Sequence, residues 1–376
     1  MMANAQPAGL EGIVAGQSSI SNVYGDEGRL IYRGYDIRDL AAHATFEEVV
    51  YLLWNGDLPN SEQLAELTAE LQANRGVPDE LLNYLEGLPH SARTMAWLRT
   101  AVSALAMYDP DAGVNTPDAN RRKAARLVAK TSTLTAAIGR IRANQKPIPP
   151  LSHGNEAHNF LYMLQGNEPD PTAARTYDVG LVLHADHEFN ASTFTARVIV
   201  STLADMYAGV TGAIGALGGP LHGGANEQVM KYLTLLDETH QDPAEWVREQ
   251  LANKQKIPGF GHRVYHTVDP RASYLREMGR EMAHKSGKDH FYQISEVVYE
   301  TMLKEKGINA NVDFFSASVF ADLGLPVILY SPSFACSRMA GWTAHVIEQL
   351  NDNRIIRPRA DYTGYTQRDW TPIESR

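Results

Sequence analysis

The chain is poor in cysteine, in strand-forming runs and in long apolar stretches, and each shortage excludes a class of protein. Its 376 residues include one cysteine, Cys336, so an intrachain disulfide is impossible and a reducing compartment is favoured. No apolar run is long enough to cross a bilayer, and the longest late candidate, 319–330, is interrupted by an aspartate, a glycine and a proline. The first six residues have neither the basic segment nor the apolar run of a signal peptide. We therefore expect a soluble, cytoplasmic protein with no membrane partner.

Basic residues are also scarce. The 34 lysines and arginines face 44 aspartates and glutamates, which leaves a formal net charge of −10. A broad nucleic-acid surface needs clustered cations that neutralise phosphates, so we expect no nucleic-acid partner. An anionic small ligand would need arginines close to its binding site to overcome the repulsion from this net negative charge. A chain of this length exceeds the size at which one core stops growing, and we expect two domains that share a ligand-binding cleft.

Most of the secondary-structure signals in the sequence indicate helices. Asn60 followed by Gln63 predicts a capped amphipathic helix that ends near Gly76. Asp170-Pro171 and Asp242-Pro243 repeat a second start signal, a capping carboxylate before a proline in the first turn. In the second case Glu245 is expected to complete a capping box.

Small residues alternate with branched apolar residues between 192 and 215, which predicts one central, buried helix against which neighbours pack closely. Strand signals are confined to one predicted hairpin, 18–24 and 29–32. The proline-rich run 146–150 cannot be helical and is expected to form an ordered loop. The fold class that follows is all-α.

Two histidines stand in glycine-rich stretches. His222 lies in 219–227 (Gly-Pro-Leu-His-Gly-Gly-Ala-Asn-Glu), and His262 lies in 258–265 (Pro-Gly-Phe-Gly-His-Arg-Val-Tyr), with Arg271 nine residues further on. Glycine removes Cβ bulk and lets backbone and substrate approach a side chain closely. Two such histidines indicate polar groups that converge on a small ligand. Taken alone, His222 is equally well explained as the cap of a helix that begins nearby.

An acidic residue, Asp313, follows Asn311 and Val312 in an otherwise apolar segment that includes Phe314 and Phe315. Apolar surroundings disfavour the charged form of a carboxylate, which suits a general base. The alternative interpretation of Asp313 alone is a helix cap.

A metal hypothesis arises from His184, Asp186 and His187, because the two histidines would share one helical face and support a metal-dependent hydrolase. No third ligand stands at an interpretable spacing and no His-Glu-x-x-His motif occurs, so we expect no metal and favour anion binding by His187. Nucleotide-binding loops are excluded as well, because no Gly-x-Gly-x-x-Gly follows a strand and no Gly-Lys-Ser/Thr occurs.

Taken together, these motifs resemble those of the citrate synthase family, in its short bacterial and archaeal type. The resemblance runs nearly end to end, from 9–12 (Gly-Leu-Glu-Gly) through 190–193 (Asn-Ala-Ser-Thr) to 357–359 (Arg-Pro-Arg), and the motifs around the two histidines and the aspartate agree in order and spacing.

This resemblance implies a two-domain architecture. Residues 1–221 and 328–376 would form a large helical domain and residues 222–327 a small helical domain, with the active site between them. It also implies a homodimer and an opening and closing movement of the domains around the substrates. Because the chain lacks the long amino-terminal extension of the hexameric relatives regulated by NADH, simple dimers are expected.

The resemblance also implies a role for each catalytic residue. Asp313 would remove a proton from the methyl group of acetyl-CoA, while His222 hydrogen-bonds the thioester oxygen as it becomes an enolate. His262 would polarise the ketone of oxaloacetate, and hydrolysis of citryl-CoA would then yield citrate and CoA, the entry step of the tricarboxylic acid cycle. No cofactor is implied beyond acetyl-CoA as co-substrate. The side chains implied in binding oxaloacetate are His187, Arg271, Arg338 and, from the neighbouring subunit, Arg357.

Contacts with CoA are implied for a loop that matches the family's adenine-binding segment and for nearby basic residues. The candidates are Lys256, Pro258, Gly259, Phe260, Gly261, Arg263, His266 and Arg359. At the position of His266 the family usually has lysine or arginine, whereas an unperturbed histidine is mostly neutral at pH 7, so phosphate binding here would be weaker or moved.

Two alternatives stay open. The 2-methylcitrate synthases share the whole catalytic set and use propionyl-CoA, and one extra methylene changes binding by only about 1–3 kcal/mol. The segment 314–318 beside Asp313 would shape that pocket. A catalytically silent paralogue that only binds an acyl-CoA or a dicarboxylate is the second alternative, since a fold does not determine a function.

Overall fold

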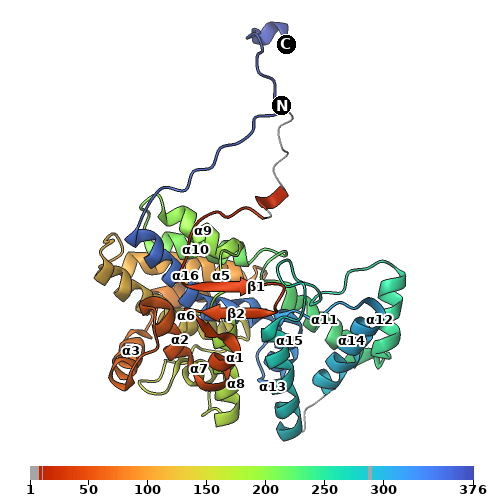
Figure 1. Ribbon diagram of the computed structural model, residues 1–376. Coiled ribbons are helices and arrows are strands. Elements are labelled where there is room, and N and C mark those ends of the chain that lie inside the picture. Colours follow the sequence, from red (N-terminus) through yellow and green to blue (C-terminus); the bar gives the residue numbers. More distant parts are fainter. Residues whose placement is uncertain (1–7, 11, 287–289) are drawn as a thin grey trace.

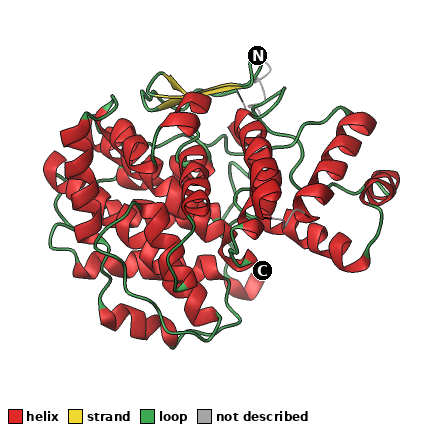
Figure 2. Cartoon of the chain, turned by 90° about the horizontal axis from the view of Figure 1, so that it is seen from below, coloured by secondary structure: helices red, strands yellow, loops and turns green. Residues whose placement is uncertain are grey.

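The fold is dominated by helices (Figure 2). The structure, a computed structural model, describes residues 8–10, 12–286 and 290–376. The first six residues, where no signal peptide is expected, and Glu11 of the first family motif lie outside that part of the chain. Among the described residues the strands form one small antiparallel sheet, in the order β1 (Ser21–Tyr24), β2 (Arg29–Tyr32) and β3 (Tyr35–Asp36). The expected hairpin is confirmed, with a short third strand added, and so is the all-α class.

Most helices pack into a large body around two long central helices, α6 (Pro117–Arg142) and α16 (Tyr330–Asn351). Every residue of α16 from 330 to 346 is buried, because neighbouring helices cover all of its faces. The other helices of the body are α1 (Ile37–His43), α2 (Phe46–Asn55), α3 (Ser61–Asn74), α4 (Asp79–Glu86), α5 (Thr94–Leu105), α7 (Glu156–Gln165), α8 (Pro171–His184), α9 (Ala191–Val200) and α10 (Met206–Leu217).

A second group of helices lies to one side of this body in Figure 1. It consists of α11 (Ala225–Thr239), α12 (Pro243–Ala252), α13 (Pro270–Ser286), α14 (His290–Lys306) and α15 (Val312–Asp322). Within the group α15 packs against α11, α13 and α14. All five helices fall inside the predicted small domain, whose boundaries stay a prediction.

The local start signals correspond to helix caps. The Asn60 side chain accepts a hydrogen bond from Gln63 N, and the Gln63 side chain returns one to Asn60 N, so the capping box of α3 is confirmed. Asp170 caps α8, and Asp242 caps α12 through the N–H groups of Ala244 and Glu245. The Glu245 side chain makes no return bond to Asp242 among the described residues, so the capping box predicted there was wrong.

The prediction of one helix across 192–215 was also wrong, because the chain turns there and forms α9 and α10. Asp205 caps α10 by accepting a hydrogen bond from Ala208 N, which starts a new helix after the turn. The small residues still act as expected, since a Cβ added at Gly209 would lie 2.6 Å from Val200 Cγ1. They let the two helices pack against each other instead of lining one long helix.

Asn353 and Ile356 bond to Ser201 at the end of α9, and the carboxyl-terminal segment 357–376 then extends away from the body (Figure 1). The proline-rich run 146–150 is a loop, as expected. A search of the described residues found no helix that combines the length and the apolar character needed to cross a membrane.

Candidate active site

His222 lies in the loop between α10 and α11, where its ring reaches back to the body. Its Nε2 is 2.9 Å from Ser192 Oγ, and that hydroxyl lies 2.7 Å from Asn190 Oδ1. The indole N–H of Trp342 donates to the same Oγ over 3.1 Å. Burial, followed by the charge of Arg338, lowers the pKa of His222 to about 4, so the ring is neutral at pH 7. Since α11 begins after Gly224 without a side-chain cap, the alternative of His222 as a helix cap was wrong.

His262 is oriented by its own loop. Its Nδ1 accepts hydrogen bonds from the backbone N–H groups of Val264 and Tyr265, at 3.0 and 3.1 Å. A nitrogen that accepts two N–H groups carries no proton, so the neutral ring holds its hydrogen on Nε2. Burial, followed by the charge of Arg271, lowers the pKa of His262 to about 4. The ring therefore presents a neutral hydrogen-bond donor.

His187 lies beside His262, with 5.3 Å between the ring centroids. Its Nε2 is 3.3 Å from the hydroxyl of Tyr265. Burial, followed by the charges of Arg271 and Arg338, holds the pKa of His187 well below its usual range. Because α8 ends at His184, His187 sits in the following loop, and the expected shared helical face was wrong.

Asp313 stands in the first turn of α15. Asn311, and not Asp313, caps this helix by accepting a hydrogen bond from Asp313 N over 3.1 Å, so the alternative of Asp313 as the cap was wrong. The Asp313 Oδ1 atom is buried without a hydrogen-bond partner among the described residues. Burial raises the pKa of Asp313 to about 6, against the opposing charge of Arg271. A carboxylate so poised can accept a proton near neutral pH.

Asp269 connects Arg271 to the start of α15. It forms a two-point ion pair with the guanidinium of Arg271, and its Oδ2 also accepts a hydrogen bond from Val312 N over 3.1 Å. The residue before Asp313 is therefore linked to Arg271 through the Asp269 carboxylate. The sequence contained the Asp-Pro-Arg motif, but the contact with α15 depends on the tertiary fold.

Arg338 projects from the buried part of α16. Its Nε donates to His184 O over 2.7 Å, and its guanidinium lies over the ring of Phe334 at 4.7 Å. No carboxylate forms an ion pair with it among the described residues. Burial lowers the pKa of Arg338 to about 10, which leaves it charged at pH 7. Its two terminal nitrogens are thus free to bind an anion.

Backbone hydrogen bonds join the glycine loop before His262 to the segment that precedes Asp313. Asn311 N donates to Gly259 O over 2.9 Å, and Gly261 N donates to Asn309 O over 3.0 Å. Gly259 has a φ of 88°, and a Cβ there would lie 2.8 Å from Val229 Cγ2 and 3.0 Å from Phe314. Glycine is required because both the left-handed backbone and the close packing exclude a side chain.

The remaining CoA candidates stand at the surface of this region. Lys256, Arg263 and His266 are exposed, and His266 Nδ1 lies 2.7 Å from Asp26 Oδ1. In the loop itself, Pro258 O accepts a hydrogen bond from the Tyr232 hydroxyl over 3.3 Å, and Phe260 packs on Phe314.

Two predicted binding residues lie away from the others. Arg357 and Arg359 are exposed and belong to the carboxyl-terminal segment that extends from the body (Figure 1). The fold of one chain therefore does not bring them to the histidines.

The cluster behind the metal hypothesis makes protein contacts instead. His184 Nδ1 bonds Gly180 O at 2.8 Å, and Asp186 Oδ2 accepts from Ser21 and pairs with His345. Within the described ranges no three histidine, cysteine or acidic side chains are arranged to hold a metal ion.

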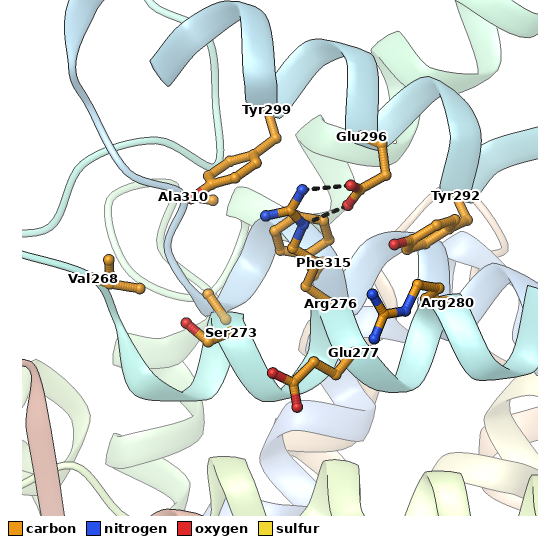
Figure 3. Close-up of a pocket in the computed structure, with 11 residues that line it drawn as sticks. Val268, Ser273, Arg276, Glu277, Arg280, Tyr292, Glu296, Tyr299, Ala310 and Phe315 are labelled. Carbon is orange, nitrogen blue, oxygen red and sulfur yellow. Dashed lines mark hydrogen bonds and ion pairs between the residues drawn. The ribbon is translucent and has the colours of Figure 1, made fainter. Parts of the chain in front are cut away.

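A separate cavity of about 360 Å³ lies between α13 and α14, behind α15. Figure 3 shows the Arg276 guanidinium in a two-point bond with Glu296, beside the ring of Tyr299. Phe315, two residues after Asp313, also lines this cavity. None of the predicted catalytic side chains lines it, so the cavity is distinct from the candidate site.

Comparisons with known proteins agree with this geometry. Residues 9–359 match the family described as citrate synthase, C-terminal domain. Citrate synthase 2 of Bacillus subtilis is 48% identical over 369 residues, which are 98% of either chain, and the 2-methylcitrate synthase of Shewanella oneidensis is 42% identical with the same coverage. The citrate synthase of Thermoplasma acidophilum, solved with carboxymethyl coenzyme A and oxaloacetate, superposes with a TM-score of 0.91 at 34% identity, over 97% of this chain and 98% of its own. The chain belongs to the citrate synthase family.

Proposed function

We propose that this enzyme condenses acetyl-CoA with oxaloacetate to give citrate and CoA. The proposal rests on one observation. The pKa of Asp313 is raised to about 6, while His222 and His262 are neutral at pH 7. The positive charges of two buried arginines, Arg271 and Arg338, act on these groups. A base, two neutral donors and two fixed cations are what the condensation of a weak carbon acid with a dianionic ketone requires.

In the proposed first step the Asp313 carboxylate takes a proton from the methyl group of acetyl-CoA. The negative charge moves to the thioester oxygen, where His222 donates a hydrogen bond. Because the Nε2 of His222 faces Ser192, the donor must be Nδ1–H, and Ser192 must then donate its hydroxyl hydrogen to Nε2. Asn190 Oδ1 keeps the N–H groups of Ser192 and Thr193 as partners in that arrangement.

In the second step the enolate carbon attacks the ketone carbon of oxaloacetate and forms the new carbon–carbon bond. The ketone oxygen becomes an alkoxide, to which His262 donates from Nε2–H, the nitrogen left free by the two backbone bonds at Nδ1. Water then cleaves the thioester of citryl-CoA and releases CoA. No cofactor other than the acetyl-CoA co-substrate takes part in these steps.

Arg271, Arg338 and His187 would bind the two carboxylates of oxaloacetate. Support comes from Arg338, whose terminal nitrogens have no carboxylate partner among the described residues, and from the charges of both arginines acting on His187. Guanidinium groups pair with carboxylates through two parallel bonds, which fixes the orientation of the ketone. Arg357 would reach the site of a partner subunit in a homodimer, an assignment supported by its place on an extended, exposed segment.

CoA would lie along the loop 256–261, with Arg263, His266 and Arg359 as basic partners. The domain division at 221/222 and 327/328 would place this loop and Asp313 on the small domain, and His187 and Arg338 on the large one. We further propose a cytoplasmic location and a place in the tricarboxylic acid cycle, in keeping with the single buried cysteine.

The test is CoA release from oxaloacetate with either acetyl-CoA or propionyl-CoA, measured on the wild type and on Asp313→Asn. We expect a preference for acetyl-CoA and a loss of about 10²–10⁴-fold in kcat in the variant. Asp352→Asn, an exposed aspartate after α16, is the matched control and should retain wild-type rates.

The other outcomes point to the alternatives. A preference for propionyl-CoA would make the chain a 2-methylcitrate synthase, which the relative from Shewanella oneidensis keeps in view. Binding of oxaloacetate without CoA release from either thioester would identify a silent binding protein. Release that Asp313→Asn leaves unchanged would remove Asp313 as the base.

A further inference from the structure

The turn between β1 and β2 packs backbone to backbone against the segment that follows His262. A Cβ added at Gly25 would come far closer to the Val264 carbonyl oxygen than the 3.0 Å that real Cβ atoms respect. A Cβ added at Gly28 would lie 2.7 Å from the Val268 carbonyl oxygen. Two glycines of the four-residue turn 25–28 are therefore packed so closely against two carbonyl oxygens of the segment 264–268 that a side chain at either position would collide with them.

Polar contacts join the same two segments. His266 N donates to Gly25 O over 3.1 Å, and the side chains of His266 and Asp26 meet at 2.7 Å. The backbone bond is the firmer of the two, because both side chains are mostly exposed and an exposed pair contributes little.

The turn itself is held by the large body. Tyr32, which is fully buried on β2, donates its hydroxyl hydrogen to Asp186 O over 2.9 Å. Ser21 on β1 donates to the carboxylate of the same aspartate. The strands that flank the 25–28 turn are thus bonded to a buried residue of the large body.

The segment 264–268 contacts the rings of His262 and His187 and leads directly into Asp269. The N–H groups of Val264 and Tyr265 orient the His262 ring, and the Tyr265 hydroxyl meets His187. Asp269 and Arg271 follow directly at the start of α13. All of these lie on the oxaloacetate side of the proposed reaction, whereas His222 and Asp313 belong to other elements.

We propose that the β1–β2 turn seats the 264–268 segment and that Gly25 is a positioning residue for oxaloacetate binding and for the His262 ring. The assignment rests on the proposed function for the identity of the ligand. A Cβ at position 25 would push the Val264 carbonyl by a sizeable part of an ångström, and a misplacement of about 1 Å in an active site lowers a rate by roughly 10²-fold.

The test compares Gly25→Ala with Gly76→Ala. Neither glycine has a positive φ, and a Cβ at Gly76 meets nothing within 4 Å, so only the substitution at Gly25 creates a close contact with Val264. The oxaloacetate dissociation constant without acyl-CoA, both Michaelis constants, kcat and the thermal midpoint are measured for each variant. For Gly25→Ala we expect oxaloacetate to bind at least about 10-fold more weakly and kcat/KM to fall by about 10- to 100-fold, with Gly76→Ala equal to wild type.

A second measurement on the wild type covers the case in which Gly25→Ala does not fold. Hydrogen exchange is followed in peptides that span 21–32 and 263–270, with and without oxaloacetate. We expect the ligand to slow exchange in both peptides together, because the segment that it orders is bonded to the turn. Protection of 263–270 alone would overturn the assignment.

The outcomes separate this inference from the proposed function. If the wild type turns over and Gly25→Ala matches Gly76→Ala, the positioning role is wrong while the function stands. Equal losses in the Michaelis constants for both substrates, with a lowered thermal midpoint, would show a general structural defect and would also overturn it. If the wild type releases no CoA, the proposed function fails, and oxaloacetate binding by the two variants still decides the role of the turn.

Discussion

The carboxylate of Asp269 and the guanidinium of Arg271 form a two-point ion pair at the start of α13, with Nε–Oδ1 and Nη2–Oδ2 distances of 3.0 and 2.9 Å. Their side chains are 1% and 3% exposed, respectively. The same carboxylate binds Val312 N, so a single buried group sets Arg271 against the helix that begins with Val312 and Asp313.

Asp269→Asn should therefore damage binding and stability together. Removing one partner of a buried ion pair costs about 3–5 kcal/mol, because the other charge is left uncompensated. We expect a lower thermal midpoint and a raised Michaelis constant for oxaloacetate. The control is Asp36→Asn, which breaks the exposed pair with Arg29 and should cost at most about 1 kcal/mol. Equal effects of the two substitutions would contradict the role given to Asp269.

Ser192→Ala tests the hydrogen bond that sets the tautomer of His222. Loss of the hydroxyl leaves Nε2 of His222 without its partner, so less of the neutral ring carries its proton on Nδ1. We expect kcat to fall by about 10- to 100-fold, with little change in oxaloacetate affinity, since the role proposed for His222 is to donate a hydrogen bond to the thioester oxygen. Steady-state kinetics with both substrates varied provide the measurement. Ser103→Ala, at an exposed site on α5, is the control, and a parallel loss in oxaloacetate binding would argue against the assignment.

The pH profile reports on Asp313. Its pKa is raised to about 6, and a base works only when deprotonated, so kcat/KM should rise with pH through about 6 and then level off. His222 and His262, with pKa values of about 4, stay neutral across this window and should add no limb between pH 5 and 8. Rates measured from pH 5 to 8 decide the matter. A profile that is flat over that range is incompatible with Asp313 as the base.

The same shift predicts how Asp313→Asn changes stability. The folded pKa lies above the unfolded value of 3.8, so folding favours the protonated form and the carboxyl destabilises the fold increasingly as pH rises from about 4 to about 6. The asparagine variant lacks this penalty. Its thermal midpoint relative to wild type should therefore be higher at pH 8 than at pH 4. A difference between the two proteins that does not vary with pH would show that Asp313 titrates normally.

His266→Lys tests the proposed phosphate contact at the mouth of the site. The side chain is exposed, and lysine would carry a full charge at pH 7. The Michaelis constant for acetyl-CoA should fall while kcat stays nearly constant. Thr239→Lys, at the exposed end of α11, adds the same charge elsewhere and should leave the constant unchanged. An unchanged constant in His266→Lys removes His266 from the CoA site.

Local features of the fold were predictable because they depend on neighbouring residues. The box between Asn60 and Gln63 and the caps at Asp170 and Asp242 each involve groups two or three positions apart, which the sequence displays directly. The prediction of one helix across 192–215 failed because its sequence pattern fits two structures. A run of small apolar residues suits one long helix or two helices packed on each other, and the cap at Asp205 together with the packing of α9 against α10 decided between them.

For the candidate site, too, the sequence and the tertiary structure contribute different information. The sequence by itself was enough to name the candidate residues. The histidines in their glycine-rich stretches and the aspartate in its apolar segment stand out locally, whereas the arginines were identified through the resemblance to the family. Only the tertiary structure decided how they are held and protonated. Ser192 meets a histidine 30 positions away and a tryptophan 150 positions away, and Asp269 reaches a backbone N–H 43 positions further on. Burial, which shifts the pKa of Asp313 upward and those of the histidines downward, exists only once distant segments have packed together.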